Sequence, residues 1–449
     1  MKQFEQVNWH TLIVGLGKTG LSVARHLSAQ GVKFAVMDTR VTPPSSDTLT
    51  EEFPDVSQYF GGFDADLMCA AKRLVVSPGI PLATPAIEKA RSLGIEVVGD
   101  VELFAIEAKA PIIGITGSNG KTTVVTLLDQ MAKRAGIKVA TGGNIGMPAL
   151  DLLQMDGVEL YVLELSSFQL ETTFNLNCKA ACILNITEDH LDRYSGRMDL
   201  YANAKAKIYD HCEFKIVNRD DERVVSIAGD ENIISFGERV PEVGQYGLIT
   251  SEGGKTQLAR GKQVLLSTDE MKVSGRHQEV NGLAAMAMAE VVGLPLTPCL
   301  EVLREFTGLE HRTQWIAEYN GINWFNDSKG TNVGATVAAM TGLAGKTVLL
   351  AGGQGKGADF NPLADVVRQC ARAVVLFGED AEDIALALKG DIPIVFARNM
   401  VDAVTQAGDL AQIGDNVLLS PACASFDMFD SYEHRGHVFV ETVKRIVQC

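Results

Sequence analysis

The residues Ile112-Ile113-Gly114-Ile115-Thr116-Gly117-Ser118-Asn119-Gly120-Lys121-Thr122-Thr123 form an apolar run, a glycine-rich turn, a lysine and two threonines. This order predicts a β-strand, a phosphate-binding loop and the start of a helix. In such a loop, backbone N–H groups and the positive end of the helix face the phosphates of a nucleoside triphosphate. Lys121 would contact the terminal phosphates, and the hydroxyl of Thr122 would ligate Mg²⁺. The sequence therefore predicts a chain that uses ATP.

The loop departs from the strict pattern at one position. A strict phosphate loop has a glycine, four further residues and then Gly-Lys-Ser/Thr, which would require glycine where this chain has Ile115. The glycine at Gly114 comes one position too early. Alternatively, the glycines only turn a strand into a helix and Lys121 is solvated. A Gly-Lys-Thr sequence directly after an apolar strand favours the nucleotide loop.

Length, charge and cysteine usage limit the class of protein. A chain of 449 residues predicts about three domains of roughly 150 residues each. The formal net charge of -16 disfavours nucleic-acid binding, so phosphorylated substrates must be attracted by local cations and amides. The eight cysteines form no C-x-x-C pair, which argues against structural zinc or a disulfide framework.

Targeting signals are also lacking in the sequence. The N-terminal segment Met1 to Gln6 has no apolar region of the kind found in signal peptides. No stretch approaches the ~20 apolar residues of a membrane span. We therefore expect a cytoplasmic protein without a membrane span.

A second glycine-rich loop lies near the start of the chain. Gly15 to Gly20 follows a predicted strand at residues 11–14, and the next strand, at 34–37, ends at Asp38. This pattern is typical of a dinucleotide site in which the acid holds a ribose of NAD. Asp38-Thr39-Arg40 also suits a pyrimidine-nucleotide head group, and tight strand-helix packing without a ligand gives the same pattern. The residues alone leave these alternatives open.

The remaining chain alternates between strand and helix patterns, which predicts an α/β fold with parallel sheets covered on both faces. A second block begins near Asp100, and a third begins around Leu309. The segment from Asn218 to Lys272 is turn-rich and predicts less regular structure, and a helix over 282–292 closes the second block. Further strands are expected at 73–76, 95–98, 160–163, 181–184, 347–351, 373–377, 394–397 and 417–419.

Two polar residues follow strands of the second block. Glu164 ends the strand at 160–163, where an acid in a phosphate-loop fold meets Mg²⁺ or its water. Its alternative role is to cap the next helix. His190 lies in a polar loop after the strand at 181–184, where it is either a surface residue or part of the site.

Taken in chain order, the motifs resemble those of the Mur ligases, the enzymes of peptidoglycan precursor synthesis. The resemblance rests on 117–123 (GSNGKTT), 142–146 (GGNIG), 164–169 (ELSSFQ), 188–190 (EDH), 311–312 (HR) and 326–329 (NDSK). It covers essentially the whole chain, and the ordered set is far more specific than any single motif. Mur ligases carry the variant ATP loop, so the displaced glycine fits the family.

The resemblance implies three domains and an assignment for the first loop. Residues 1–99 would form a Rossmann-like domain for a UDP-sugar, 100–308 a central ATPase domain with a P-loop-type parallel sheet, and 309–449 a Rossmann-like domain that brings in an amino acid. The first loop would then bind uridine diphosphate rather than NAD. The residues implied for this substrate are Gly15, Leu16, Gly17, Lys18, Thr19, Asp38, Thr39 and Arg40, with Asn144 and Gln169 on the muramoyl part.

The implied activity is amide-bond formation driven by ATP. The γ-phosphoryl group would pass to the L-alanine carboxylate of UDP-N-acetylmuramoyl-L-alanine, and the amine of D-glutamate would attack the acyl phosphate through a tetrahedral intermediate. Implied catalytic residues are Lys121, Glu164, His190 and Lys205. A monomer is expected.

Two Mg²⁺ ions are implied as well. Thr122 and Glu164 would hold one, and His190 and Lys205 the second. Because a cationic amine cannot ligate a metal, the family's solution is a carbamate on the lysine. From the residues alone Lys205 is a solvated helix lysine, so this assignment rests on the resemblance.

The resemblance also assigns the remaining contacts. ATP would be bound by Gly117, Ser118, Asn119, Gly120, Lys121, Thr122, Thr123, Asn281, Arg312, Asp327 and Lys329, and D-glutamate by Thr331, Lys356, Ser425, Phe426 and Tyr432. Lys356 follows a predicted strand in a glycine-rich loop that can present a cation to a carboxylate. Two positions depart from the family pattern: Gln278 stands where asparagine is usual, and Gln314 where glutamate is common.

Three rival functions remain at this stage. An NAD-dependent oxidoreductase would use the first loop and Asp38, but leaves the Gly-Lys-Thr loop and Glu164 without a role. A related Mur ligase or folylpolyglutamate-type ligase would use another acceptor, and the UDP-binding domain discriminates it. A nucleotide-gated binding module would bind ATP without substrate-dependent phosphate release.

Overall fold

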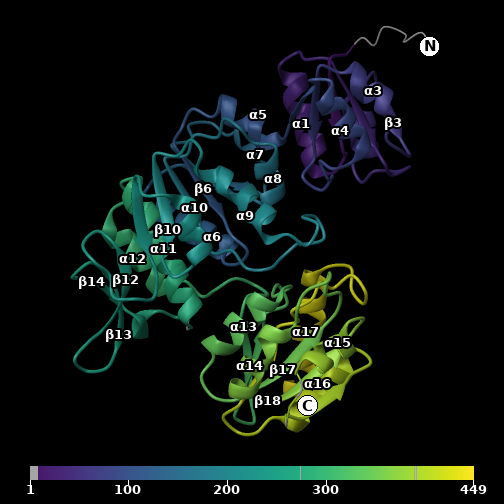
Figure 1. The fold of residues 1–449 in the computed structure, drawn as a ribbon. Coiled ribbons are helices and arrows are strands. Elements are labelled where there is room, and N and C mark those ends of the chain that lie inside the picture. Colours follow the sequence, from purple (N-terminus) through teal and green to yellow (C-terminus); the bar gives the residue numbers. More distant parts are fainter. Residues whose placement is uncertain (1–8, 274, 389, 391, 449) are drawn as a thin grey trace.

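The computed structural model describes residues 9–273, 275–388, 390 and 392–448, which fold into three lobes, each around its own β-sheet (Figure 1). The segment Met1 to Gln6 and Cys449 lie outside the described residues. The sheets have five, nine and six strands in chain order. This arrangement confirms the α/β class and the three-domain organisation, and the predicted boundaries after residues 99 and 308 fall between elements.

The first lobe is a fully parallel sheet in the order β3-β2-β1-β4-β5. Its two faces are both buried, because Leu12 and Val14 of β1 pack in one core while Ile13 packs in another. The elements are β1 (Thr11–Val14), α1 (Lys18–Ala29), β2 (Phe34–Asp38), α2 (Ser46–Glu52), β3 (Ser57–Phe60), α3 (Ala65–Ala70), β4 (Arg73–Val76), α4 (Pro85–Ser92) and β5 (Glu96–Val98). The strand order reverses beside β1, which is where α/β sheets open a ligand crevice.

The second lobe has the sheet order β14-β13-β12-β11-β10-β9-β6-β8-β7. Helices α6, α11 and α12 pack on one face, and α5 with α7, α8 and α9 on the other. The elements to β9 are α5 (Asp100–Glu107), β6 (Ile112–Thr116), α6 (Lys121–Arg134), β7 (Val139–Gly143), α7 (Ala149–Leu152), β8 (Leu160–Glu164), α8 (Ser167–Glu171) and β9 (Ala180–Ile183). The others are α9 (Met198–Ala206), η1 (Lys207–Tyr209), β10 (Phe214–Asn218), α10 (Glu222–Ala228), β11 (Ile233–Phe236), β12 (Tyr246–Thr250), β13 (Thr256–Arg260), β14 (Gln263–Ser267), η2 (Thr268–Glu270), α11 (Arg276–Val291) and α12 (Leu296–Glu305).

The segment from Asn218 to Lys272 is more regular than its sequence suggests, so that expectation was wrong. It contains the α-helix α10, the short 3-10 helix η2 and the strands β11 to β14, and β13 pairs antiparallel with both β12 and β14. Each of β13 and β14 buries only two of its five residues, too few for a clear alternating pattern. Their buried residues, such as Leu258 and Leu266, join the core formed with α11, so tertiary packing decides this structure.

The third lobe has the sheet order β15-β16-β20-β17-β18-β19, parallel except for the antiparallel hairpin β15-β16. Asn320 and Gly321 turn that hairpin with φ of 52° and 74°, as an Asn-Gly turn requires. The elements are β15 (Gln314–Tyr319), β16 (Ile322–Asn326), α13 (Val333–Gly342), β17 (Thr347–Gly352), α14 (Asn361–Cys370), β18 (Ala371–Phe377), α15 (Ala381–Leu388), β19 (Ile394–Phe396), α16 (Met400–Leu410), β20 (Asn416–Leu419) and α17 (Tyr432–Gln448).

The fold places the loops that carry the sequence motifs at the ends of strands. In the second lobe Ile115 of β6 pairs in parallel register with Glu164 of β8. The predicted phosphate-binding loop at residues 117–122, called the ATP loop below, therefore starts beside that acid. In the third lobe the loops after β16, β17 and β20 leave the same edge of the sheet. Among the described residues no helix is long and apolar enough to cross a membrane.

Candidate active site

The ATP loop has the backbone geometry that its glycines permit. Gly117 and Gly120 have φ of 150° and 85°, and α6 begins at the next residue, Lys121. A Cβ atom at position 120 would lie 2.6 Å from Oδ1 of Asn281, so only glycine fits there. The Lys121 ammonium donates to the carbonyl oxygens of Gly117 at 2.7 Å and Ser118 at 3.0 Å. Burial lowers the pKa of Lys121, and the charge of Glu164 acts to raise it.

Glu164 lies beside this loop, on the strand that pairs with β6, and it is 2% exposed. The hydroxyl of Thr122 donates to its Oε2 at 2.9 Å, and the amide of Asn144 donates to its Oε1 at 2.9 Å. Arg312, which belongs to the third lobe, donates a hydrogen bond of 2.5 Å to the hydroxyl oxygen of Thr122. An octahedral Mg²⁺ holds oxygens at about 2.1 Å, so two oxygens 2.9 Å apart suit neighbouring ligands of one ion.

Lys205 is buried rather than solvated, so the interpretation from the residues alone was wrong. Its side chain on α9 is 2% exposed, and its amine donates to the Gly117 carbonyl at 3.0 Å and to Thr116 Oγ1 at 3.3 Å. Burial and then the charge of Lys121 lower the pKa of Lys205 well below its ordinary value. The helix sequence alone does not show this, because the burial comes from β6 and the ATP loop.

His190 lies on a loop with left-handed backbone, at φ of 53°. Its ring meets the ring of Phe168 edge-on at 5.0 Å, and its Nε2 lies 3.6 Å from Oδ1 of Asp189. Burial lowers the pKa of His190, and Asp189 acts to raise the pKa of both His190 and Lys205. The EDH segment thus faces the same cluster of charges as the ATP loop.

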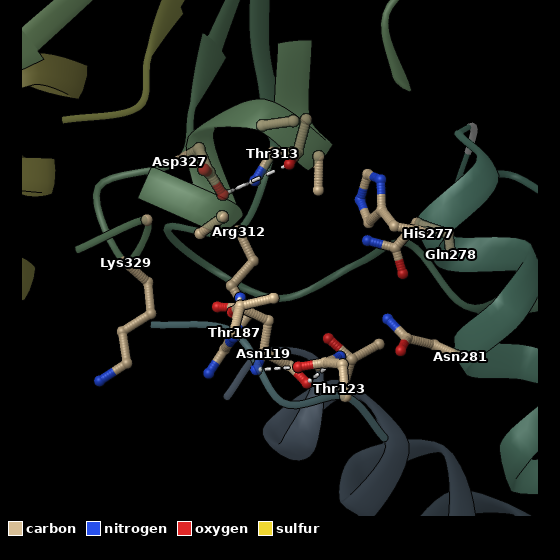
Figure 2. A pocket seen from close by; sticks show the side chains of 17 residues that line it. Asn119, Thr123, Thr187, His277, Gln278, Asn281, Arg312, Thr313, Asp327 and Lys329 are labelled. Atoms are coloured by element: carbon tan, nitrogen blue, oxygen red, sulfur yellow. Dashed lines mark hydrogen bonds between the residues drawn. The ribbon is translucent and has the colours of Figure 1, made fainter. Parts of the chain in front are cut away.

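A cavity of about 250 Å³ opens beside the ATP loop, between the second and third lobes (Figure 2). The structure brings all four ATP-assigned residues outside the loop onto its wall: Asn281, Arg312, Asp327 and Lys329. Further wall residues, which the sequence did not indicate, include Asn185, Thr187 and His277. In Figure 2 the labelled side chains of Asn119, Thr123, Thr187, His277, Asn281 and Arg312 lie around one space, and Lys329 runs along its edge.

The acid and the lysine on this wall have shifted pKa values. Asp327 accepts from the Thr313 backbone N–H at 2.9 Å and from the Ser420 hydroxyl at 2.7 Å, and burial raises its pKa to about 6. The Lys329 ammonium lies 3.7 Å from the ring centroid of Tyr432, and burial lowers its pKa to about 8. Tyr432 of the third lobe therefore lies next to a residue that lines the cavity beside the ATP loop, called the ATP cavity below.

The two departures from the family pattern have different places. Gln278 is 6% exposed and lies on the cavity wall, where it presents an amide to the ligand space. Gln314 turns inward, and its Oε1 accepts from the backbone N–H of His311 at 3.3 Å. An amide at position 314 thus holds the turn that precedes Arg312.

A second, smaller cleft lies between the EDH segment and the third lobe. It is lined by Glu188, Asp189, His190, Leu191, Thr331, Asn332, Gly355, Lys356, Gly357, Ala358 and Ala422. The structure thus brings Thr331 and Lys356, two of the residues expected to bind D-glutamate, into one cleft with His190. Of the others, Ser425 is 2% exposed and Phe426 is 68% exposed, and neither lines this cleft.

The first glycine loop forms a third cavity, and this one spans the first and second lobes. Its wall contains Gly15, Gly17, Lys18, Thr19, Asp38, Thr39 and Arg40 from the first lobe, and Gly143, Asn144 and Gln169 from the second. The segment Ser77 to Ile80, which directly follows β4, also lines it. Leu16 is fully buried, and it contributes its backbone N–H to Asp38 instead of a wall.

Asp38 already has partners for both carboxylate oxygens. The Leu16 N–H donates to Oδ2 at 2.7 Å, and Arg40 donates to Oδ2 at 2.6 Å and Oδ1 at 2.9 Å. Burial acts to raise the pKa of Asp38, but the hydrogen bonds from Arg40 and Leu16 outweigh it and lower the pKa to about 2. This acid therefore fixes the loop and Arg40, a use that differs from holding a ribose in an NAD site.

Comparisons with known proteins cover all three lobes. The chain matches the models of the Mur ligase MurD-like N-terminal domain over residues 9–99, the Mur ligase middle domain over 115–289 and the Mur ligase glutamate ligase domain over 311–423. It is 52% identical over 447 residues to the UDP-N-acetylmuramoylalanine--D-glutamate ligase of Nitrosococcus oceani, covering 99% of this chain and 98% of that protein. The ligase of the same name from Pseudomonas putida is 51% identical over 436 residues, covering 96% of each chain.

Solved structures share the fold at low identity. MurF ligase from Thermotoga maritima, in complex with ADP, superposes with a TM-score of 0.62 at 16% identity, covering 99% of this chain and 97% of that chain. A Mycobacterium tuberculosis folylpolyglutamate synthase complexed with ADP and AMPPCP gives a TM-score of 0.57 at 16% identity, covering 74% of this chain and 91% of that chain.

Proposed function

The chain belongs to the Mur ligase family, and we propose that it joins D-glutamate to UDP-N-acetylmuramoyl-L-alanine at the expense of ATP. One observation carries the proposal. Asn144 lines the cavity of the first lobe, and its amide donates to Glu164 beside the ATP loop at 2.9 Å. The end of a substrate held in the first cavity would therefore lie next to the γ-phosphate of ATP.

The chemistry starts with the carboxylate of the L-alanyl group, which is a poor electrophile. A carboxylate oxygen attacks the γ-phosphorus of ATP, the bond to the bridging oxygen breaks, and ADP leaves with an acyl phosphate in place. Lys121 at the loop and Arg312 from the third lobe supply positive charge beside the phosphates. Mg²⁺, held by Thr122 and Glu164 when bound, would neutralise charge on the phosphate oxygens.

The second cation site is part of the same proposal. Lys205 is buried, and its lowered pKa favours the neutral amine that reacts with CO₂. Formation of the N–C bond releases one proton and leaves a carbamate. The carbamate oxygens make the lysine side chain able to ligate a metal. That carbamate and His190 would hold a second Mg²⁺.

The amine acceptor would enter the cleft between the second and third lobes. Lys356 lies there opposite His190 and presents a cation to a carboxylate of D-glutamate, with Thr331 on the same wall. The neutral amine of D-glutamate attacks the acyl carbon, and the tetrahedral intermediate expels phosphate to leave the amide. Ser425 and Phe426, from the segment between β20 and α17, and Tyr432, at the start of α17, are proposed to complete this site.

The first cavity is proposed to hold uridine diphosphate. The backbone of the Gly15 to Thr19 loop and the start of α1 would meet the pyrophosphate, and Asp38 to Arg40 the uridine. Asn144 and Gln169 would contact the muramoyl part. We propose that the protein acts in the cytoplasm, where these substrates would be found. We also propose that it is a monomer.

A phosphate-release assay tests the function. ATP, Mg²⁺ and UDP-N-acetylmuramoyl-L-alanine are supplied with a panel of D- and L-amino acids, and only D-glutamate should stimulate release strongly. Stimulation by another amino acid, or by a folate acceptor, would assign a related ligase. Oxygen-18 in the alanyl carboxylate should appear in the released phosphate, and its absence would contradict the acyl phosphate.

A further inference from the structure

We propose that the first turn of α13, through Asn332 and Gly334, positions the amino-acid lobe on the ATP loop and so assembles the acceptor cleft. This inference rests on the proposed function, because it assigns the residues that join the two halves of that active site. Asn332 lines the acceptor cleft directly after Thr331 and is 7% exposed.

The side chain of Asn332 has contacts in both lobes. Within its own lobe it caps α13, because its Oδ1 accepts from the backbone N–H of Ala335 at 2.9 Å. Towards the second lobe its amide exchanges hydrogen bonds with the amide of Asn119, at 3.2 Å and 3.4 Å. Its Nδ2 also lies 3.4 Å from Oδ2 of Asp189. The amide of Asn332 thus joins the start of α13 to both the ATP loop and the EDH segment.

Asn119 is itself fixed within the second lobe. Its backbone N–H donates to Oδ1 of Asn185 at 2.8 Å, and the amide of Asn185 donates back to its carbonyl at 3.1 Å. Its side-chain amide reaches the Thr187 hydroxyl at 3.4 Å, a contact drawn in Figure 2. The partner of Asn332 is therefore a rigid part of the nucleotide loop, and a change in that loop reaches α13 directly.

Gly334 gives an independent reason to regard this turn as a docking point. A Cβ atom at position 334 would lie 3.0 Å from Oγ1 of Thr187 and 3.4 Å from Nδ2 of Asn119. Thr187 cannot withdraw easily, because its backbone N–H and carbonyl both bond to the hydroxyl of Ser118, at 3.0 Å and 2.8 Å. A side chain at position 334 would therefore fit only if Thr187 or Asn119 shifted, so the helix packs tightly against both.

The hydrogen bond from Arg312 to Thr122 crosses the same boundary, but it lies on the phosphate side. Asn332 is the contact on the acceptor side, between Thr331 and Asp189. Its loss should therefore weaken the binding of D-glutamate and leave the cavity of the first lobe unaffected, since that cavity contains no residue of the third lobe.

Two variants and two matched controls test the proposal in the full chain. Asn332→Ser keeps a residue that caps helices but is too short to reach Asn119, and Gly334→Ala adds a methyl group that favours the helix yet presses on Thr187. Asn399→Ser changes the corresponding cap of α16. There the side chain of Asn399 accepts from the backbone N–H of Asp402 at 3.0 Å. Gly408→Ala adds a methyl group inside α16 that meets only Trp324, at 3.6 Å.

The readouts are the KM for each substrate and the radius of gyration from small-angle X-ray scattering with a non-hydrolysable ATP analogue. Asn332→Ser and Gly334→Ala should each raise the KM for D-glutamate at least tenfold, leave that for the UDP-sugar within twofold, and give a more open particle than wild type. Both controls should stay within twofold of wild type. Equal losses in variants and controls, or an equal rise in the KM for the UDP-sugar, would overturn the proposal.

Failure of the proposed function is distinguishable from failure of this inference. A wild-type chain that releases no phosphate in response to D-glutamate contradicts the function alone. The scattering experiment still tests the contact in that case, because it needs only the ATP analogue. Wild-type compaction retained in Asn332→Ser and Gly334→Ala would then overturn the inference.

Discussion

The ATP loop and the acceptor cleft differ in how the chain brings their residues together. The loop is one contiguous segment, its acid lies on a strand paired with β6, and Lys205 reaches it from the same lobe. The cleft is formed only where two lobes meet, and three of its residues, His190, Lys356 and Ala422, have φ of 53°, 54° and 59°. The proposed function therefore assigns activation of the carboxylate largely to one domain and selection of the amine to the place where two domains meet.

If the loop site is largely complete within one domain, substitutions there should reduce the chemical step. Glu164→Gln keeps the size of the side chain but removes the negative charge that Mg²⁺ needs, so kcat should fall about a thousandfold. The KM for D-glutamate should change little. The measurement is steady-state phosphate release. Glu159→Gln, directly before the start of β8, is the control and should remain within twofold of wild type; a similar loss there would show a general effect on the strand.

Lys205→Ala sharpens the same side of the comparison, with a smaller effect. It should reduce kcat about a hundredfold, because it removes the proposed carbamate ligand, and an added short carboxylic acid should restore part of the rate. Lys207→Ala, two residues further on, should not respond to the acid. Its amine donates to the carbonyl of Glu171 at 2.7 Å, away from the loop. Near wild-type turnover of Lys205→Ala without rescue would contradict the carbamate.

A substitution in the cleft should act on the acceptor instead of the rate. Lys356→Met keeps a long side chain at the same backbone conformation but removes the charge, so the KM for D-glutamate should rise about thirtyfold, as expected for a lost charged hydrogen bond. The KM for ATP should remain unchanged. Lys346→Met controls for charge on this lobe. The amine of Lys346 donates to the carbonyl of Gln369 at 2.9 Å. A large fall in kcat with an unchanged KM would place Lys356 in the chemical step.

The smallest effect concerns Lys329, which comes from the third lobe but faces the ATP cavity. Its pKa is lowered to about 8, so the ammonium is charged below that pH and loses its charge as the pH rises through it. At pH 8.5 the value of kcat/KM for ATP should be about fourfold below its plateau near pH 6.5 to 7. Lys329→Arg keeps the charge and should remove this inflection. A profile that is flat in the wild type would indicate that the third lobe does not reach the ATP cavity in solution.

The sequence predicted the ATP loop and the position of Glu164 because both depend on local rules. A strand followed by Gly-Lys-Thr specifies its own turn and helix start, and an acid at a strand end takes its place from the parallel register. Burial of Lys205 could not be read from α9, since its environment comes from β6 and the loop, far away in the chain. The strands β13 and β14 were missed for a similar reason, because their short buried faces are defined by α11.

The hairpin β15-β16 was within reach of the sequence but went unrecognised. Asn320-Gly321 between two runs of β-type residues is a strong turn signal. The contact between Asn332 and Asp189 has no comparable pattern in the sequence, because an asparagine before a helix indicates only a helix cap. Their contact across two lobes becomes visible only when the lobes are placed together.

By itself the sequence determined the α/β class, the family and the ATP-using chemistry, because periodic apolar patterns and contiguous motifs encode local structure. Tertiary structure alone decided that Lys205 is a buried amine, that Asp38 is held by Arg40 and Leu16, and that Thr331 and Lys356 face His190. The physical reason is that burial, electrostatic environment and interdomain contact depend on groups distant in the chain, whose positions no local pattern specifies.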